Sequence, residues 1–125
     1  MRTSPARGRW AEDVALEFLT ESLGYRFHAR NVRIAGGEID LVLRDGDVQV
    51  FVEVKARRGD RVRAGGAVTA DKRLRLSRAA AAWIARHGAP AGGCRFDLVA
   101  VEGRGARTHV EHFPAAFDTP TRWNV

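Results

Sequence analysis

The chain has 125 residues, 45% of them hydrophobic and 29% charged, which predicts one globular domain over residues 1–125 and excludes a second core. Its formal net charge of +6 favours a polyanionic partner, although a basic but otherwise ordinary protein rich in arginine would carry the same charge. No apolar run is long enough for a secretory signal or a membrane anchor, so we expect neither, and we expect a cytoplasmic protein.

Residues 1–8 are expected to form a flexible N-terminal segment, and residues 9–23 a first helix. On a helical wheel the apolar side chains of 9–23 make one broad arc, acidic side chains fill the opposite side, and Gly24 supplies the stop. Glu12 falls inside the apolar arc, where a carboxylate is costly unless it has a cation or donors. Two interpretations stay open: Glu12 belongs to a functional site, or it caps amides and serves the dipole of the first helical turn.

Three predicted strands follow, over residues 25–34, 38–44 and 48–57. In the second and third strands charged residues alternate with aliphatic ones, so each strand turns its charged groups to one face and its aliphatic groups to the other. The third strand also carries Phe51 on its charged face, which indicates burial on both sides. A buried strand seldom carries an acid and a lysine without a reason, and this argues against an ordinary solvated ion pair there.

The turn between the second and third strands sets the register of the charged residues. A type I′ turn at residues 45 and 46 places Glu38 opposite Glu53 and makes Asp40 a diagonal neighbour of Glu53. Lys55 then lies one step further along the same face. A slip of one residue would put Asp40 and Glu53 on opposite faces, so the prediction depends on this turn.

The second half of the chain is predicted to hold a loop, a helix and further strands. Residues 58–68 combine arginine with glycine and are expected to form a mobile basic loop. Residues 69–87 read as a second helix, and residues 95–101 as a strand that the right-handed crossover rule lays parallel to the third strand. Residues 108–113 are a candidate last strand.

Cysteine and histidine do not predict a zinc site. Cys94 is the single cysteine, which excludes an internal disulfide and a Cys-x-x-Cys knuckle. His109 and His112 have the spacing of a metal pair on one face of a helix, but their neighbours are typical of a strand and no third ligand stands near them.

The acids and the lysine of the second and third strands predict a metal-dependent nuclease site. Magnesium prefers oxygen ligands and keeps several waters, so one or two carboxylates and a substrate phosphate suffice. Asp40 and Glu53 are the expected ligands of Mg²⁺ or Mn²⁺, and Glu38 is a candidate outer ligand. Lys55 is expected to orient the attacking water or to stabilise developing negative charge, and Glu12 is a candidate further catalytic acid.

Lysine is rare in this chain, because its 21 basic residues are 19 arginines and the two lysines Lys55 and Lys72. A lysine ammonium is a compact charge with a tunable pKa, and arginine cannot replace it where such a charge must meet a water or a phosphoryl oxygen. We therefore expect Lys72 near phosphate. The expected nucleic-acid contacts are basic side chains in and beside the 58–68 loop: Lys72, Arg57, Arg58, Arg61, Arg63 and Arg73.

Motifs spread over most of the chain also resemble a known family. They are Gly8-x-x-Ala11-Glu12-x-x-Ala15, Asn31-x-Arg33, Gly37-Glu38-Ile39-Asp40-Leu-Val, Phe51-Val-Glu53-Val-Lys55-x-Arg57, Lys72 and Arg95-Phe-Asp97. The set is similar to the YraN-like family of small bacterial proteins, within the restriction-endonuclease-like PD-(D/E)xK superfamily. Ile39 stands where that superfamily has a proline, and Ala11 where the family usually has a glycine.

This resemblance implies an α/β fold with a restriction-endonuclease-like α-β-β-β-α-β core, in which helices flank a mixed central sheet. It also implies a Mg-dependent site formed by Asp40, Glu53 and Lys55. Glu12 corresponds in position to a helix-borne acid of the archaeal Holliday junction resolvases. Because this superfamily also includes inactive binding modules, an intact set of residues favours activity without demonstrating it.

The function favoured by the sequence is a metal-dependent endonuclease, a hydrolase acting on DNA, with branched or single-stranded repair and recombination intermediates as candidate substrates. The alternative is a non-catalytic nucleic-acid-binding adaptor that retains the nuclease fold and serves a helicase-type partner. A weaker third idea is a protein-interaction module. A homodimer is a further expectation, in which Trp10, Trp83 or Trp123 lies at the interface, but each is as readily placed in the core.

Overall fold

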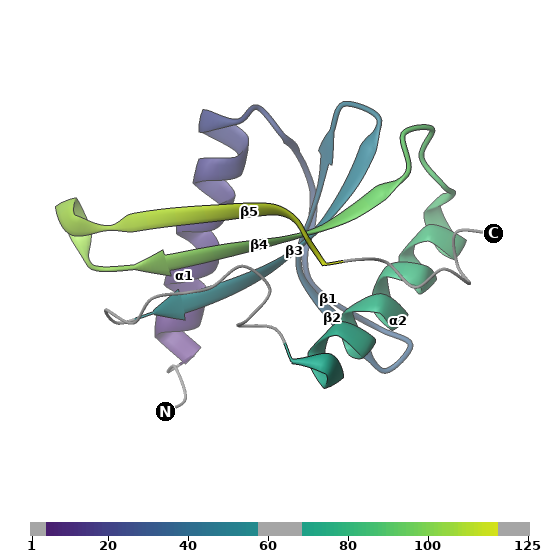
Figure 1. Cartoon of the computed structure of the whole chain (residues 1–125), viewed down its shortest axis with the longest axis horizontal. Coiled ribbons are helices and arrows are strands. Elements are labelled where there is room, and N and C mark those ends of the chain that lie inside the picture. The colour runs from purple at the N-terminus through teal and green to yellow at the C-terminus, as the bar shows by residue number, and fades with distance from the viewer. Residues whose placement is uncertain (1–4, 58–68, 118–125) are drawn as a thin grey trace.

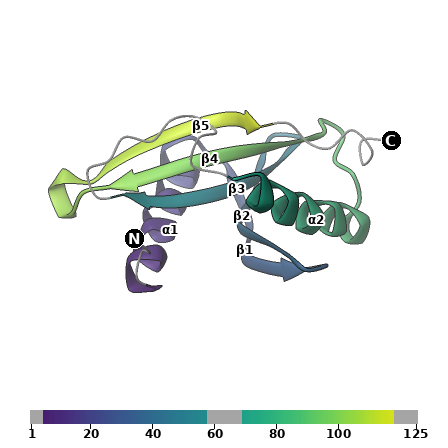
Figure 2. The same ribbon diagram turned by 60° about the horizontal axis from the view of Figure 1, so that its bottom comes forward.

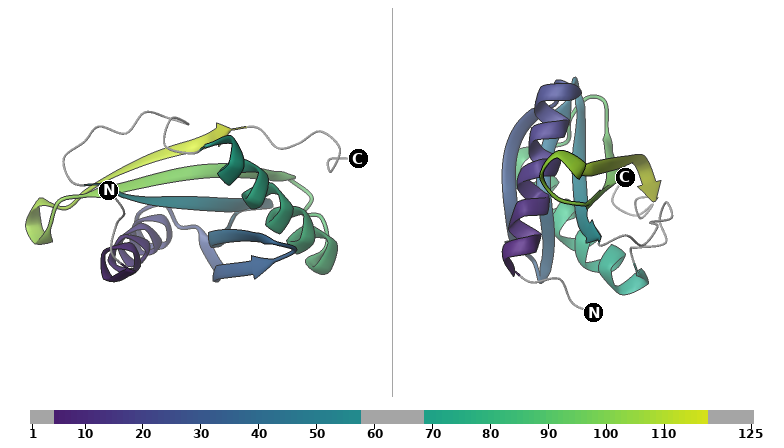
Figure 3. Two further views of the ribbon diagram at one scale, coloured as in Figure 1. Left: turned by 90° about the horizontal axis from the view of Figure 1, so that it is seen from below. Right: turned by 90° about the vertical axis from the view of Figure 1, so that its left-hand side faces the viewer.

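The structure, a computed structural model, describes residues 5–57 and 69–117 and has a five-stranded mixed sheet with one helix packed on each face (Figures 1 and 3). In chain order the elements are α1 (Pro5–Glu17), the π-helical turn η1 (Phe18–Ser22), β1 (Arg26–Ile34), β2 (Gly37–Asp45), β3 (Val48–Arg57), α2 (Ala70–His87), β4 (Cys94–Glu102), the 3₁₀ turn η2 (Gly105–Arg107) and β5 (His109–Phe117). The strands lie in the order β1-β2-β3-β4-β5, with β3 and β4 parallel and the other neighbours antiparallel. The predicted α/β class is confirmed, and β5 extends the expected core.

Two apolar clusters hold the helices against the sheet. Phe51 and Phe96 belong to the cluster beneath α2, and Val50 and Val52 to the cluster beneath α1. Residues 50–52 are fully buried, so β3 is covered on both sides as its sequence predicts. Among the described residues no helix has the length and apolar character that crossing a membrane would require.

The N-terminal prediction needs correction. Helix α1 begins at Pro5, so residues 5–8 form its first turn and are not a flexible segment. Proline is favoured in a first helical turn because its missing N–H would have no intrahelical partner there. Residues 1–4 and the expected mobile loop 58–68 lie outside the described residues.

The hairpin between β2 and β3 has a different register from the predicted one. Asp45 pairs with Val48, which leaves Gly46 and Asp47 as the two turn residues. Gly46 has φ of 60° and takes the first turn position, where a two-residue hairpin turn favours glycine. Asp45 remains in the ladder, where its carboxylate accepts a hydrogen bond from Arg95 at 3.1 Å. The observed pairing of β2 with β3 differs from the predicted pairing by two residues. Because side chains alternate with a period of two, those near the turn keep the faces that were predicted for them.

Strand β2 does not keep one aliphatic face along its length, contrary to the sequence pattern. Ile39 packs in the cluster beneath α2, whereas Leu41 packs in the cluster beneath α1. The strand therefore twists at Asp40. Across from this position in β1, between the partners of Leu41 and Ile39, Asn31 has a left-handed φ of 53°. Past this point β1 and β2 diverge from β3, as Figure 1 shows.

Candidate active site

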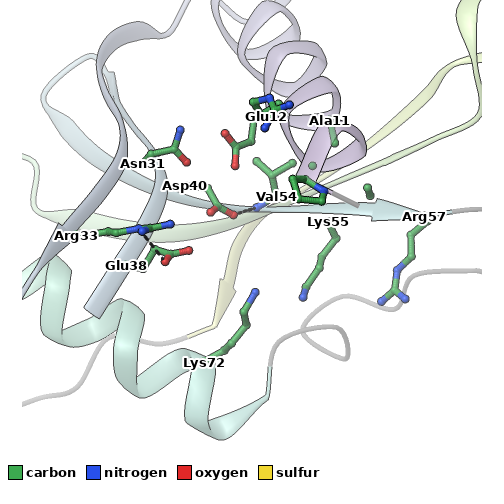
Figure 4. A pocket seen from close by; sticks show the side chains of 14 residues that line it. Ala11, Glu12, Asn31, Arg33, Glu38, Asp40, Val54, Lys55, Arg57 and Lys72 are labelled. Carbon is green, nitrogen blue, oxygen red and sulfur yellow. Dashed lines mark hydrogen bonds and ion pairs between the residues drawn. The ribbon is translucent and has the colours of Figure 1, made fainter. Parts of the chain in front are cut away.

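An open cavity of about 830 Å³ lies where β1 and β2 diverge from β3, between α1 and the start of α2 (Figure 4). Its polar lining comes from five elements: Arg9 and Glu12 from α1, Asn31 and Arg33 from β1, Glu38 and Asp40 from β2, Lys55 and Arg57 from β3, and Lys72 from α2. Six of the predicted site residues thus meet in one cavity, although they are widely separated in the sequence. Glu53 does not line it, and lies instead in a small pocket that it shares with Glu38, Lys72 and Arg75.

Asp40 lies directly beyond the last pair of the β2–β3 ladder, Leu41 with Val52. Its carboxylate accepts the backbone N–H of Val54 at 2.8 Å. Burial and the neighbouring negative charge of Glu53 raise the pKa of Asp40 well above its usual value, although the Val54 hydrogen bond opposes them. Two carboxylates are therefore crowded together, and one of them is inclined to hold a proton.

Glu53 contacts both lysines of the chain. It is 5% exposed in the middle of β3. Its Oε2 forms an ion pair with Lys72 and lies 3.9 Å from the Nζ atom of Lys55. The two ammonium groups offset the cost of removing this carboxylate from water. The only two lysines of the sequence thus lie together in the structure, both at Glu53.

The two lysines have different protonation tendencies. Burial and the positive charge of Lys72 lower the pKa of Lys55. Burial works in the same direction at Lys72, but there the close contact with Glu53 dominates and raises the pKa. Lys55 therefore loses its proton more readily than an ordinary lysine, which suits a group that accepts or passes on a proton.

Two features of α2 place Lys72 against the sheet. The Thr69 hydroxyl accepts the backbone N–H of Lys72 at 3.2 Å and caps the helix. Gly37 lies against the middle of α2, where an added Cβ would come within 2.0 Å of the Arg75 carbonyl oxygen. This close approach requires glycine, and it brings the first turn of α2 near Glu53.

Glu12 reaches the same cavity from α1. Its Oε1 accepts a hydrogen bond from Arg30 at 3.2 Å, and the same guanidinium donates to Asp13 at 2.9 Å. The side chain of Glu12 is 15% exposed, and its negative charge adds to the forces that raise the pKa of Asp40. Because α1 begins at Pro5, Glu12 lies beyond the first turn, and the capping interpretation is wrong.

Glu38 lies at the rim of the cavity. It is the cross-strand partner of Arg33 and its carboxylate is 3.4 Å from that guanidinium. Its side chain is half exposed. The predicted position opposite Glu53 is wrong, because the ladder between β2 and β3 ends at Leu41. Glu38 is thus the most exposed acid of the predicted metal set, although it lines a small pocket together with Glu53.

The remaining predicted residues fall into three groups. Arg57 lines the cavity. Arg73 is exposed on α2, and its guanidinium lies over the Phe117 ring at 5.3 Å, away from the cavity lining. Arg58, Arg61 and Arg63 lie outside the described residues. The histidine pair does not form either: His112 contacts Asp97 at 2.8 Å, while His109, three residues earlier in a strand, is exposed.

Sequence reasoning missed Arg30 and gave no separate role to Asn31. Arg30 supplies the cation that the buried position of Glu12 requires, and a search for such a partner would have pointed to the next strand. Asn31 adopts a left-handed φ, which asparagine tolerates better than most residues, beside the twist of β2. Its amide faces the cavity near Glu12 and Asp40 (Figure 4).

The acids suit a metal held by few protein ligands. Among residues 5–57 and 69–117 no group of three or more aspartate, glutamate, histidine or cysteine side chains is arranged to hold a metal ion. Asp40 and Glu53 are nevertheless adjacent, and a divalent cation between them would relieve the repulsion that raises the pKa of Asp40. This arrangement fits Mg²⁺, which takes one or two carboxylates and completes its shell with water and phosphate.

Comparison with known proteins identifies the family. Residues 11–101 match the family described as Uncharacterised protein family UPF0102. A UPF0102 protein of Symbiobacterium thermophilum is 56% identical over 96 residues, which cover 76% of this chain and 80% of the relative. UPF0102 proteins of Yersinia pseudotuberculosis and Yersinia pestis are 46% identical over 117 residues, 90% of this chain and 94% of theirs. The chain belongs to the UPF0102 family, the YraN-like family that its motifs resemble.

Proposed function

We propose that this protein is a metal-dependent endonuclease that hydrolyses phosphodiester bonds of DNA in the cytoplasm, as a member of the restriction-endonuclease-like superfamily. One observation carries the proposal: Asp40, which lines the open cavity, is crowded against the buried Glu53 beside it, and both lysines of the chain converge on Glu53. A structural ion pair would need only one carboxylate and one cation. Crowded acids with a pKa-shifted lysine are typical of a site that binds a metal and moves protons.

Each residue has a role that its surroundings support. Asp40 and Glu53 would hold Mg²⁺ or Mn²⁺, which when bound supplies an activated water and neutralises charge on the phosphoryl group. Lys55 would accept a proton from the attacking water or donate to a phosphoryl oxygen, since its lowered pKa favours exchange. Glu12 would orient water from the α1 side, and Glu38 would contact an outer-shell water at the rim.

The basic rim of the cavity would bind the substrate backbone. Arg33, Arg57 and Lys72 line the cavity and can contact phosphate oxygens on either side of the reacting group. Lys72 would exchange Glu53 for a phosphate when the metal occupies the carboxylates. This requirement couples metal binding to substrate binding. Branched or single-stranded repair and recombination intermediates are the proposed substrates, and a homodimer is the proposed form for cutting two strands.

The test is cleavage across junction, flap, single-stranded and duplex substrates with Mg²⁺ or Mn²⁺. Asp40→Asn and Lys55→Ala should each abolish metal-stimulated cleavage and leave salt-dependent DNA binding largely intact. Asp71→Asn is the matched control, because Asp71 is an exposed acid on α2 whose side chain is 81% accessible. Wild-type protein that binds these substrates and cuts none of them would refute the proposed activity.

One observation favours the alternative of a non-catalytic nucleic-acid-binding adaptor that serves a helicase-type partner. The Lys72 ammonium contacts Glu53 directly and thus neutralises a carboxylate that the metal would need. Calorimetric titration with Mn²⁺ separates the two functions. An endonuclease should bind the metal in the presence of DNA and lose this binding in Asp40→Asn, whereas an adaptor should bind no metal in either form.

A further inference from the structure

A second cavity lies at the opposite end of the β1–β2 hairpin. Its volume is about 390 Å³, and its lining consists of Gly24, Arg26, His28, Arg44 and Gly46. The cavity is formed by the start of β1, the end of β2 and the turns that adjoin them. It shares no residue with the cavity that contains Asp40.

The side chains of this second cavity carry positive charge without compensation. Arg26 and Arg44 are direct cross-strand partners, and like charges in that relation repel. Within residues 5–57 and 69–117, neither arginine forms an ion pair with an acid, and no acid lines the cavity. Asp45 follows Arg44 in the sequence, but its carboxylate is bound to Arg95. The two arginines therefore lack the counter-charge that such a pair requires.

Arg44 also has an unused hydrogen-bond donor. Its Nε atom is buried and has no partner among the described residues. A buried donor of this kind costs free energy and requires an explanation. An oxyanion in the cavity would match the planar fork of the guanidinium, and it would supply the missing acceptor once the Arg44 side chain turns its Nε toward the cavity.

The pKa of His28 is also affected by the positive charge around this cavity. Burial and the charges of Arg44, Arg26 and His87 all lower the pKa of this histidine. No carboxylate contributes to its surroundings in the opposite sense. His87 is the last residue of α2, so the helix C-terminus also borders this region.

Helix α2 extends from the first cavity, which Lys72 lines, toward the strand that carries His28. It packs against β1 and β2 (Figure 2). Near one end Lys72 pairs with Glu53, and at the other end the charge of His87 acts on His28. At 1.5 Å per residue these ends are separated by roughly 20 Å. Phosphates of one DNA strand repeat about every 3.4 Å along the duplex axis, so the separation corresponds to about six nucleotides.

We propose that Arg26, His28 and Arg44 form a second phosphate-binding site, which holds a backbone phosphate of the same nucleic acid that lies at Asp40 and Glu53. The inference rests on the proposed function for the nature of the ligand. The second site would fix the direction in which the strand crosses the protein, because the two cavities lie at opposite ends of α2.

The test compares two double variants that remove equal charge. Arg26→Ala/Arg44→Ala should weaken binding to a duplex of about 20 base pairs by roughly tenfold, and the slope of log affinity against log salt concentration should fall by about one, the value for one phosphate. Arg104→Ala/Arg107→Ala, from exposed positions at the η2 turn, is the control and should change both much less. Equal losses in the two variants would overturn the proposal, since net charge would then explain them.

Three further measurements keep the outcomes distinct. The first variant should unfold at the same or a higher temperature than wild type, because it removes a repelling pair. Arg44→Lys, which keeps the charge but loses the fork, should give an intermediate affinity. A titration with inorganic phosphate, in which the Arg44 Nε–H signal is followed by NMR, tests whether the site binds free phosphate and not a nucleic-acid phosphate. A shift that depends on both arginines, combined with unchanged DNA affinity in the double variant, would overturn the assignment to nucleic acid.

Failure of this inference differs from failure of the proposed function. Equal DNA affinities of the wild-type protein and of Arg26→Ala/Arg44→Ala would overturn the second site alone, and cleavage that still depends on Asp40 would then support the first. Wild-type protein that binds no nucleic acid at low salt overturns both.

Discussion

Two acids are buried in adjacent strands of the same sheet, and their surroundings differ. Asp97 in β4 is fully buried and accepts hydrogen bonds from Arg95 at 2.9 Å, His112 at 2.8 Å and the Ala115 backbone at 3.0 Å. Glu53 in β3 is nearly as buried, but its ion pairs come from two lysines and another carboxylate lies beside it. Both acids tolerate burial, and only one has its hydrogen-bonding capacity filled by fixed neighbours.

The protonation tendencies of the two regions diverge accordingly. Burial would raise the pKa of Asp97, but the hydrogen bonds from His112 and Arg95 outweigh it and lower that pKa. At Asp40 burial and Glu53 act together and raise the pKa. A saturated carboxylate stabilises the fold, whereas a crowded and incompletely satisfied pair costs stability and is available to a cation. This difference separates the structural cluster from the proposed catalytic one.

The largest expected effect is the loss of stability in Asp97→Asn. This change removes the buried one of the two carboxylates that pair with Arg95 and puts an amide NH₂ among groups that donate, so the free energy of unfolding should fall by about 3 kcal/mol. Chemical denaturation at neutral pH measures it. A loss below about 1 kcal/mol would mean that the cluster around Asp97 is not the fixed, saturated network described above.

Asp40→Asn is the matched variant in the other region. An asparagine at this position can still accept the Val54 N–H and donate to Glu53, much as a protonated aspartic acid would. Its free energy of unfolding should equal or exceed that of wild type. If Asp40→Asn lost as much stability as Asp97→Asn, both regions would be structural.

The pH dependence of stability should have opposite signs in the two regions. Since the folded pKa of Asp40 is raised above its ordinary value of 3.8, its contribution to stability is present below that value and is lost as pH rises through the folded pKa. The folded pKa of Asp97 is lowered, so its contribution is present above 3.8 and is lost as pH falls through the folded pKa.

Unfolding free energies of wild type, Asp40→Asn and Asp97→Asn at a series of acidic pH values measure this difference. As pH rises from about 4, the unfolding free energy of Asp40→Asn should increase relative to that of wild type. As pH falls below 4, the difference in unfolding free energy between wild type and the less stable Asp97→Asn should become smaller. Parallel profiles for the two variants would show that the two carboxylates do not differ in the way their contacts predict.

Much of the fold could be predicted from local sequence patterns. The alternation of residues in β2 and β3 and the apolar stripe of α2 are direct consequences of strand and helix periodicity. The parallel placement of β4 beside β3 follows from the handedness of crossover connections, and it is confirmed. Strong periodicity over long elements is the most reliable signal in a single sequence.

The prediction of the hairpin turn is wrong because a tertiary contact determines the strand register there. Both Asp45–Gly46 and Gly46–Asp47 can form a two-residue turn, and the bond from Arg95 to Asp45 keeps Asp45 in the strand. Nothing local to the sequence reveals a partner fifty residues away. The start of α1 at Pro5 is not predicted for a local reason: its first turn contains Pro5 and Gly8 and no large apolar side chain that would extend the helical pattern.

The sequence predicts which residues belong to the candidate site better than it predicts which of them contact one another. The rarity of lysine singled out Lys55 and Lys72, and both meet Glu53. That Lys72 would contact Glu53 directly, and that Arg30 would bind Glu12, depends on how α2 and α1 pack on the sheet. The sequence contained no indication of the pairing between Arg26 and Arg44, because it depends on the strand register.

A smaller effect is expected at the helix cap that holds Lys72. The ligands of Asp97 come from its own strand and the adjacent one, whereas Glu53 depends on the first turn of α2. Thr69→Ala removes the hydroxyl that accepts the Lys72 N–H and should cost about 1 kcal/mol of stability. It should also weaken the contact between Lys72 and Glu53, which the titration of the Lys72 Nζ group, followed by NMR, would report.

Thr69→Ser is the control for that change, because serine caps a helix as well as threonine does and should restore both stability and titration. If Thr69→Ala left the Lys72 titration unchanged, packing of α2 against Gly37 alone would position the lysine.

The smallest expected effect on stability comes from the two adjacent acids that share Arg30. Asp13 is 66% exposed, so Asp13→Asn should cost at most about 0.5 kcal/mol and leave cleavage unchanged. Glu12 lines the cavity and acts on Asp40, so Glu12→Gln should lower cleavage roughly 10- to 100-fold at little cost in stability. Because the two variants lose the same partner, a difference between them in cleavage assays depends on the cavity and not on Arg30. Equal activity in both variants would assign Glu12 to the structural class that Asp97 represents.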